Sequence, residues 1–334
     1  MNSDRLRIGQ GMRGLLGMLL FFAGATGCAK TPQAKPHLQP GDHELTLQVG
    51  ELERRYIVHV PAGHSPGKPL PVVIMLHGGG GTARGAMRET GWARKADAEH
   101  FLAVFPDAMP PDPGQPSRFG TNGQAWNDGS GRFHSGEKDI PDVAFIDAML
   151  DDLEARFAID RRRVYATGFS NGAAMTFRIG VELATRIAAI APFAGAMWPE
   201  PSRFDHPVSL YYITGDADPL NPLDGGLPKF ATGARVRTGT ERVKPSVRAA
   251  VDLWARLLGC GAETCAVDAP SGVKTFIHSG GRNGSEVRFT VIEGHGHIWP
   301  GGLNQLPERM VGKPSPALNA TDAIWAFFRQ HARP

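Results

Sequence analysis

Short apolar stretches recur along the chain, and they follow two patterns. Residues 43–49 and 54–60 alternate apolar and polar positions, which predicts two antiparallel strands with one face in solvent. The other stretches are continuously apolar, the pattern of strands that are covered on both faces. They are residues 71–76, 101–105, 164–167, 188–193 and 209–214. The chain therefore predicts a leading hairpin followed by the central strands of a parallel sheet.

Segments with helical spacing alternate with these strands. They are residues 84–99, 143–157, 171–185, 245–258 and 321–331. This alternation predicts a doubly wound α/β fold with a mostly parallel sheet, in one domain over residues 43–334. Two segments rich in Gly, Pro and polar residues interrupt it, 106–141 and 217–244. Because open α/β sheets bind ligands beyond the carboxyl ends of their strands, these loops are expected beside the functional site.

The first 28 residues have the features of an export signal. Three arginines precede an apolar run over residues 15–23 that is too short to span a bilayer, and small residues then precede Cys28 as in a bacterial lipobox. Cys28 is expected to carry the lipid that anchors the protein to the outer or cell membrane; simple cleavage and secretion is the alternative. Residues 29–42, which lack periodicity, are expected to form a flexible tether.

Composition narrows the class of protein. The chain has 334 residues of which 41% are hydrophobic, enough for a packed core. Its 36 basic and 33 acidic residues give a net charge of only +3, and no stripe of Lys and Arg is interleaved with aromatic residues. Nucleic-acid binding is therefore not expected, and the membrane is expected as a partner only through the lipid.

Residues 168–172 read Gly-Phe-Ser-Asn-Gly and directly follow the apolar run 164–167. A serine between two glycines after a strand is the sequence form of a nucleophile elbow, a strained turn that lifts the hydroxyl above the sheet. Only small residues two positions before and after the serine let the flanking backbones approach closely. Ser170 is therefore the candidate nucleophile.

A run of four glycines, residues 78–81, follows His77 at the end of another apolar run. A flexible turn and a phosphate loop are alternatives, but the run has neither the Gly-Lys-Ser/Thr ending nor the Gly-x-Gly-x-x-Gly spacing of phosphate loops. An oxyanion loop explains it better, because glycines let backbone amides point at the charge that develops on a carbonyl oxygen. The expected donors are the amides of Gly78, Gly79 and Asn171.

A serine nucleophile needs a histidine base that is oriented by a carboxylate, here in the chain order serine, acid, histidine. Asp216 and Asp218 both follow the apolar run 209–214; Asp218 is the candidate acid, and Asp216 is expected to cap or brace the turn. His295 and His297 follow a later strand pattern, and spacing does not separate them. A two-histidine metal site is the chemical rival, but no close Asp, Glu or His completes it, so no metal or organic cofactor is expected.

Together these motifs resemble a family of secreted α/β-hydrolase esterases that includes polyhydroxybutyrate depolymerases, feruloyl esterases and acetylxylan esterases. The resemblance covers about residues 45–330 and rests on segments 76–81, 125–127, 142–146, 168–172, 215–219 and 296–301. It implies an α/β-hydrolase fold. It also implies that Ser170 is the nucleophile, Asp218 the orienting acid and His297 the general base.

The resemblance also bears on the substrate. Many depolymerases have His-Gly-Cys where this chain has residues 77–79, and they add a linker and a polymer-adsorbing domain, which argues against solid polyester. Trp126 and Trp299 are candidates for the acyl pocket, with ordinary aromatic packing as the alternative. Flat rings at the site would suit an aromatic or sugar-linked ester.

Two cysteines remain once Cys28 is set aside, Cys260 and Cys265. An even pair in an exported chain predicts a disulfide, and two buried free thiols are the alternative. A metal site at this pair lacks further ligands.

The sequence thus predicts an exported carboxylic ester hydrolase that works through an acyl-enzyme. Its expected substrates are polyhydroxyalkanoate-type esters or feruloyl or acetyl esters of polysaccharides, as small molecules or oligomers. The alternative is a catalytically silent envelope-associated protein that uses the same scaffold to hold a glycan or polymer. The complete set of motifs argues against that alternative.

Overall fold

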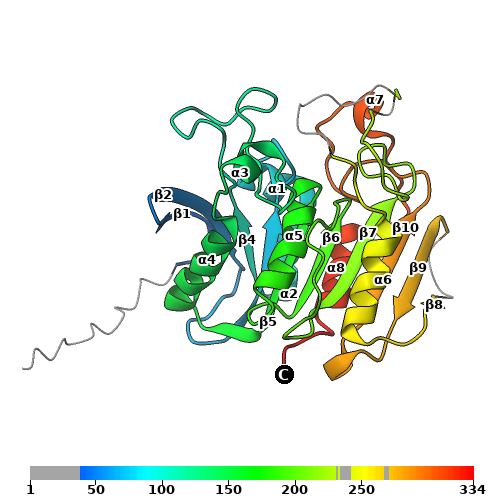
Figure 1. The fold of residues 1–334 in the computed structure, drawn as a ribbon. Helices are drawn as coiled ribbons and strands as arrows, with labels where there is room; N and C mark the ends of the chain where they lie inside the picture. The colour runs from blue at the N-terminus through cyan, green and yellow to red at the C-terminus, as the bar shows by residue number, and fades with distance from the viewer. Residues whose placement is uncertain (1–37, 231, 234–241, 267–270) are drawn as a thin grey trace, which may run out of the picture. The chain divides into compact units, whose positions relative to one another are not determined.

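A ten-stranded sheet forms the centre of the computed structural model, which describes residues 38–230, 232–233, 242–266 and 271–334. The strand order is β1-β2-β4-β3-β5-β6-β7-β10-β9-β8 (Figure 1). The strands are β1 (Gly41–Val49), β2 (Leu52–Val60), β3 (Leu70–Leu76), β4 (Leu102–Pro106), β5 (Ile159–Phe169), β6 (Ala189–Phe193), β7 (Ser209–Gly215), β8 (Thr264–Cys265), β9 (Val273–His278) and β10 (Val287–Ile292).

The direction of the strands follows the pattern of apolar residues. The six neighbours from β4 to β10 run parallel, and β1 and β2 form an antiparallel hairpin against β4. Alternate residues of β1 are exposed, whereas every residue of β3, β4, β6 and β7 is buried. The predicted fold, a mostly parallel sheet with a leading hairpin, is confirmed.

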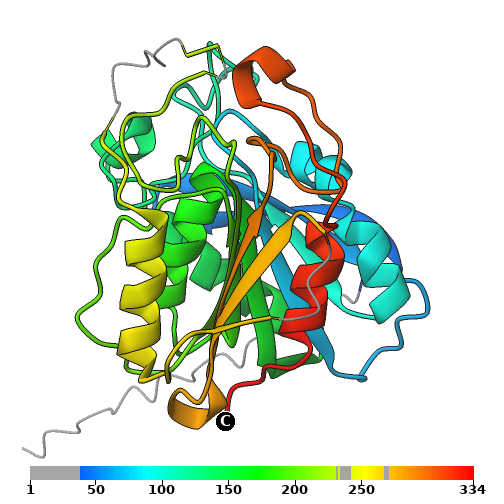
Figure 2. The same cartoon turned by 90° about the vertical axis from the view of Figure 1, so that its right-hand side faces the viewer.

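Helices cover both faces of the sheet. They are α1 (Ala83–Thr90), α2 (Trp92–Glu99), α3 (Phe133–Glu137), α4 (Asp142–Arg156), α5 (Asn171–Glu182), α6 (Val247–Leu258), α7 (Glu308–Val311) and α8 (Ala320–Phe328), with a short 3₁₀ helix at Arg282–Gly284. One apolar core lies under α4, α5 and α6, and a second lies under α1, α2 and α8. Figure 2 views the sheet nearly edge-on, with α6 on one side and α8 on the other. No described helix is both long and apolar enough to cross a membrane.

The structure divides one of the predicted helices into two. The segment predicted over residues 84–99 breaks at Gly91, which has a φ of 71° and ends α1 in the left-handed region. A helix cannot continue through that conformation, and glycine adopts it without steric cost. The break turns Trp92 into the core, where its ring stacks on Phe328 of α8.

The irregular segments lie beyond the carboxyl ends of the parallel strands, at the top of Figure 1. The chain between β4 and α4 holds the short helix α3, and the chain between β7 and α6 holds Asp216 and Asp218. A third segment joins β10 to α8 and contains α7. These three segments meet above the sheet, where the sequence placed the functional site.

The N-terminal end of the described chain bears on two other predictions, the export signal and the tether. Residues 1–37, with the predicted export signal, Cys28 and most of the tether, lie outside the described residues. Strand β1 begins at Gly41, so the last two residues of the predicted tether, 41 and 42, belong to the sheet.

The predicted disulfide is absent, because Cys260 and Cys265 are both free thiols. Cys260 Sγ lies 3.9 Å from the carbonyl oxygen of Ser285, and Cys265 Sγ lies 3.9 Å from that of Ala266. Cys260 is partly buried against the turn before β10, while Cys265 is exposed on the edge strand β8. An even count of cysteines does not reveal that one thiol is partly buried and the other exposed.

Candidate active site

Ser170 lies at the sharp turn between β5 and α5, with φ 56° and ψ −115°. Few residues other than glycine adopt this conformation, so the turn stores strain. Its backbone amide donates to the carbonyl oxygen of Phe193 at the end of β6, 3.0 Å away. The hydrogen bond fixes the turn to the neighbouring strand.

Three glycines make this turn possible. A Cβ on Gly172 would lie 2.2 Å from the carbonyl oxygen of Leu76, and one on Gly168 would lie 2.4 Å from that of Gly172. Gly195 is equally close, because its Cβ would lie 2.4 Å from the carbonyl oxygen of Ser170. The glycine requirement inferred from the sequence thus has a steric cause on both sides of the elbow.

Asp218 and His297 come together from the loops after β7 and β10. His297 Nδ1 lies 2.7 Å from Asp218 Oδ2, and both side chains are almost fully buried. The other carboxylate oxygen accepts from the amides of Leu220 and Asn221, each at 2.8 Å. The His297 ring also packs against Phe169, the residue before Ser170, at 4.7 Å between centroids.

The two alternative residues have other roles. Asp216 Oδ1 accepts from the amide of Gly294 at 2.7 Å, so it braces the histidine loop. His295 Nε2 donates to the carbonyl oxygen of Ile298 at 2.7 Å, and its Nδ1 accepts from the amide of Ser315 at 2.8 Å. Burial lowers the pKa of His295, which favours its neutral form. Among the described residues, no group of three or more His, Cys, Asp or Glu side chains is arranged to hold a metal ion.

The glycine loop lies directly against the elbow. A Cβ on Gly78 would lie 3.4 Å from Ser170 Cβ, and one on Gly79 would lie 3.6 Å from Asn171 Cβ. The carbonyl oxygen of Gly78 is 2.8 Å from His77 Nδ1 and 2.9 Å from the amide of Gly81. Because a peptide bond is planar and trans, the N–H of Gly79 points away from that carbonyl and from His77.

His77 is fully buried and has a defined tautomer. Its Nε2 accepts from the amide of Ala108 at 3.1 Å, so Nδ1 carries the proton that it donates to Gly78. Burial lowers the pKa of His77, which keeps the ring neutral. The histidine that opens the glycine run therefore orients the run.

A cavity of about 330 Å³ opens beside the glycine loop and His297. Phe119 and Leu303, which line it, are 60% and 65% exposed. Trp299 also lines it, although its indole nitrogen donates a hydrogen bond to Thr321 Oγ1 and its ring is mostly buried. Trp126 does not line this cavity: it is wholly buried and donates to the carbonyl oxygen of His77 at 3.0 Å. The prediction of Trp126 as a pocket residue is therefore wrong, and its packing alternative is correct.

A buried polar network behind Asp218 has no signal in the sequence. Asn221 Oδ1 accepts from Lys244 Nζ at 3.1 Å, and Asn221 Nδ2 donates to the hydroxyl of Tyr212 at 3.0 Å. That hydroxyl donates to the carbonyl oxygen of Gly195, beside Ser170. Burial, helped by the charge of Arg132, lowers the pKa of Lys244 to about 8. A lysine at the end of an irregular segment looks like a solvated surface residue in the sequence.

This arrangement matches a known family. Residues 60–224 fit the family model of phospholipases and carboxylesterases, over a segment that contains the glycine loop, the elbow and Asp218. The chain has the α/β-hydrolase fold and is similar to this family. The resemblance inferred from the sequence motifs is thereby confirmed.

Individual relatives support the same general class. NocK of Nocardia uniformis subsp. tsuyamanensis, which is named as an esterase, is 28% identical over 294 residues, or 84% of this chain and 80% of NocK. Feruloyl esterase C of Emericella nidulans is 27% identical over 211 residues, or 61% of this chain and 66% of that enzyme. The crystal structure of a thermostable esterase has a TM-score of 0.50 at 17% identity and covers 87% of this chain and 63% of that one; it shows the shared fold. The family model and the named relatives support ester hydrolysis as the class of activity for this protein.

Proposed function

We propose that this α/β-hydrolase is a serine carboxylic ester hydrolase whose catalytic triad is Ser170, His297 and Asp218. The observation that carries the proposal is the buried 2.7 Å contact between His297 Nδ1 and Asp218 Oδ2. It lies next to a strained elbow, because the His297 ring packs on the residue that precedes Ser170. A silent binding protein would have no need of this buried pair beside a strained serine.

The reaction follows from these roles. Ser170 Oγ attacks the ester carbonyl carbon while His297 Nε2 takes its proton, and the tetrahedral intermediate then expels the alcohol, which His297 protonates. Water hydrolyses the resulting acyl-serine with His297 again as base. Asp218 holds the Nδ1–H tautomer and stabilises the imidazolium that forms in each half of the reaction.

The amides of Gly79 and Asn171 are the proposed oxyanion donors, with Gly78 as a further candidate. The N–H of Gly79 is turned away from His77 because the Gly78 carbonyl faces it. Asn171 opens α5, so its N–H is among those that a helix leaves without an internal acceptor. Each donor to the oxyanion is worth about 3 kcal/mol in the transition state.

The proposed substrates are feruloyl or acetyl esters of polysaccharides. The cavity beside the glycine loop has a volume within the range of roughly 300–1,000 Å³ that is usual for small-molecule sites. Phe119, Trp299 and Leu303 give it apolar walls, which suit a flat aromatic acyl group. The names of the relatives point the same way, and hydroxybutyrate oligomers are the comparison substrate.

The test is the rate of ester hydrolysis by the purified protein and its Ser170→Ala variant. We expect release of p-nitrophenol from short-chain esters and of ferulate from methyl ferulate, and loss of about 10⁴-fold or more in kcat for the variant. Comparison of methyl ferulate, acetylated xylan and hydroxybutyrate oligomers then ranks the acyl groups. Activity that survives Ser170→Ala overturns the mechanism, and inhibition by a chelator would favour metal chemistry at the histidines.

We also propose that the protein is exported and that Cys28 carries a lipid, since the first 28 residues have the sequence features of a lipoprotein signal. Mass spectrometry of the mature N-terminus tests this. A lipidated Cys28 at the terminus is the expected result, and an unmodified terminus beyond it excludes the anchor.

A further inference from the structure

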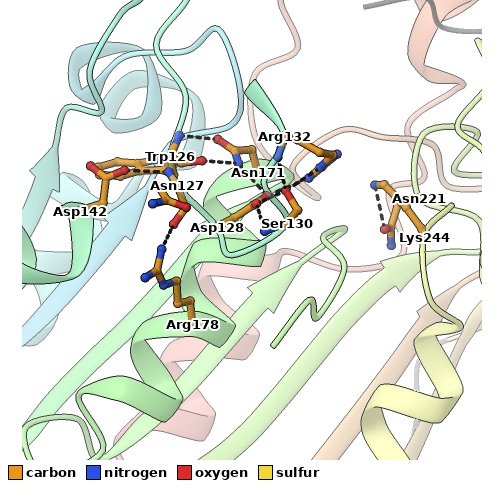
Figure 3. Close-up of polar contacts among 10 residues, drawn as sticks. All are labelled: Trp126, Asn127, Asp128, Ser130, Arg132, Asp142, Asn171, Arg178, Asn221 and Lys244. Carbon is orange, nitrogen blue, oxygen red and sulfur yellow. Dashed lines mark hydrogen bonds and ion pairs between the residues drawn. The ribbon is translucent and has the colours of Figure 1, made fainter. Parts of the chain in front are cut away.

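The side chain of Asn171 makes two hydrogen bonds to the backbone of one residue, Trp126. Asn171 Oδ1 accepts from the amide of Trp126 at 2.7 Å, and Asn171 Nδ2 donates to the carbonyl oxygen of Trp126 at 3.1 Å (Figure 3). The carboxamide therefore holds the segment before α3 as a neighbouring strand would hold it. This use of the side chain is separate from that of the Asn171 backbone amide.

A third contact fixes which way the carboxamide points. Asn171 Nδ2 also donates to Asp128 Oδ2 at 2.9 Å, and that carboxylate is fully buried. Arg132 and Ser130 hold Asp128 in place, as Figure 3 shows. A carboxylate accepts and never donates, so the nitrogen of the carboxamide must face Asp128 and the oxygen must face the Trp126 amide.

The segment that Asn171 holds is attached in turn to the glycine loop. The indole nitrogen of Trp126 donates to the carbonyl oxygen of His77 at 3.0 Å, and the carbonyl oxygen of Gln124 accepts from the amide of Gly80 at 2.6 Å. These two bonds flank Gly78 and Gly79 along the chain. A displacement of residues 124–126 would therefore displace the glycine loop on both sides of the proposed oxyanion donor.

We infer that the carboxamide of Asn171 is a positioning group that sets the glycine loop, through Trp126, at the correct distance from the Asn171 amide. One residue thus supplies one oxyanion donor and locates the other. Donors act only when they lie 2.7–3.1 Å from the position of the oxyanion. A small displacement of the loop therefore weakens binding of the transition state more than binding of the ester. This inference rests on the proposed function, because it assumes that an oxyanion forms at Ser170.

The test compares Asn171→Ala, Trp126→Phe and the double variant. Asn171→Ala keeps the backbone amide and loses the carboxamide, whereas Trp126→Phe loses the indole donor to His77 and part of a buried ring. We expect each to lower kcat about 10- to 100-fold with KM changed less than about threefold, the size of effect that a 1 Å misplacement produces. Because the two links act in series, the double variant should be little slower than the slower single variant.

Thr176→Val is the matched structural control. Thr176 lies on the same helix, is fully buried, and donates from Oγ1 to the carbonyl oxygen of Gly172 at 2.8 Å. It should lower the midpoint of thermal unfolding about as much as Asn171→Ala while it leaves kcat near that of the unaltered enzyme. A trifluoromethyl ketone that forms a tetrahedral adduct should bind Asn171→Ala more weakly by the same factor as the loss in kcat/KM.

The outcomes separate the two claims. Full activity of Ser170→Ala overturns the proposed function itself. Inactive Ser170→Ala together with unchanged kcat in Asn171→Ala, additive effects in the double variant, or equal loss of kcat in Thr176→Val overturns the positioning role alone. If Asn171→Ala does not fold, Trp126→Phe decides by itself: unchanged kcat and unchanged ketone affinity contradict the inference.

Discussion

The two halves of the site are held by different kinds of contact. Around Ser170, Gly168, Gly172 and Gly195 bring backbones so close that an added Cβ would lie 2.2–2.4 Å from a neighbouring backbone oxygen. Around Asp218 and His297, hydrogen bonds of Asp218 and Asp216 join the loop after β7 to the loop after β10, and further side-chain bonds brace the segment after β7. The first half is fixed by close steric contact of the elbow and the start of α5 with the backbones of β3, β5 and the turn after β6. The second depends on a buried polar network that contains a titratable cation.

This difference predicts how each half fails. A steric contact between backbones leaves no intermediate position, so a substitution there should act on the fold. A hydrogen-bonded network of ionisable groups responds to charge, so substitutions there should act on rate and on pH dependence. The predictions below test that division.

The largest effect on stability is expected from Gly172→Ala. The new methyl group would lie 2.2 Å from the carbonyl oxygen of Leu76 and 2.4 Å from that of His77, and neither backbone has room to yield. We expect the free energy of unfolding to fall by at least about 3 kcal/mol, measured by urea denaturation. Gly261→Ala is the control, because its methyl would only touch Ser279 at 3.4 Å; it should change stability by less than about 1 kcal/mol. A Gly172→Ala protein as stable as its control would refute the steric account.

A substitution in the half of the site around Asp218 and His297 should instead lower the rate of hydrolysis. Asp218→Asn should lower kcat by about 10⁴-fold, because the carboxamide no longer holds His297 in the required tautomer, while the fold remains intact. Asp216→Asn is the matched control, since an amide oxygen still accepts from Gly294; it should cost less than about tenfold. Steady-state hydrolysis of a p-nitrophenyl ester measures both. The opposite ranking would make Asp216 the orienting acid.

The fold could be predicted where the burial of residues follows the repeat of apolar and polar positions in the sequence. The half-exposed β1 and the wholly buried β3 differ in the alternation of their residues, because one face of the hairpin meets solvent. Strand β9, which lies between β10 and the edge strand β8, was missed, since it is buried mainly at its two ends and shows neither pattern. The break at Gly91 was missed as well, because glycine is compatible with a helix until tertiary packing selects its positive φ.

The site was predictable where chemistry needs a local motif. The elbow requires glycines at fixed positions, so Ser170 could be identified from residues 168–172. The choice between His295 and His297 depends on how the loop bends at Gly296, whose Cβ would lie 2.2 Å from the carbonyl oxygen of Val311. The buried contact of Lys244 could be recognised only from the three-dimensional structure, because its partner Asn221 lies 23 positions away along the chain.

The smallest effect is expected from Lys244→Met. Burial lowers the pKa of Lys244 to about 8, below its value in the unfolded chain, so between about pH 8 and 10 the unfolded state holds more protons. Stability from this group therefore rises with pH across that window, by about 2 kcal/mol, and the methionine variant should lack the rise. Urea denaturation at pH 7.5 and 10 measures the difference. The exposed Lys229→Met is the control and should behave like the unaltered enzyme.

The most direct measurement for the central claim is the site of covalent labelling. The enzyme is treated with a fluorophosphonate, digested, and mapped by mass spectrometry, with Asp218→Asn treated in parallel. We predict one adduct per chain, on Ser170 in the peptide that contains residues 168–172, and much slower labelling in the variant. An adduct on another residue, or no adduct in an enzyme that hydrolyses esters, would contradict the account.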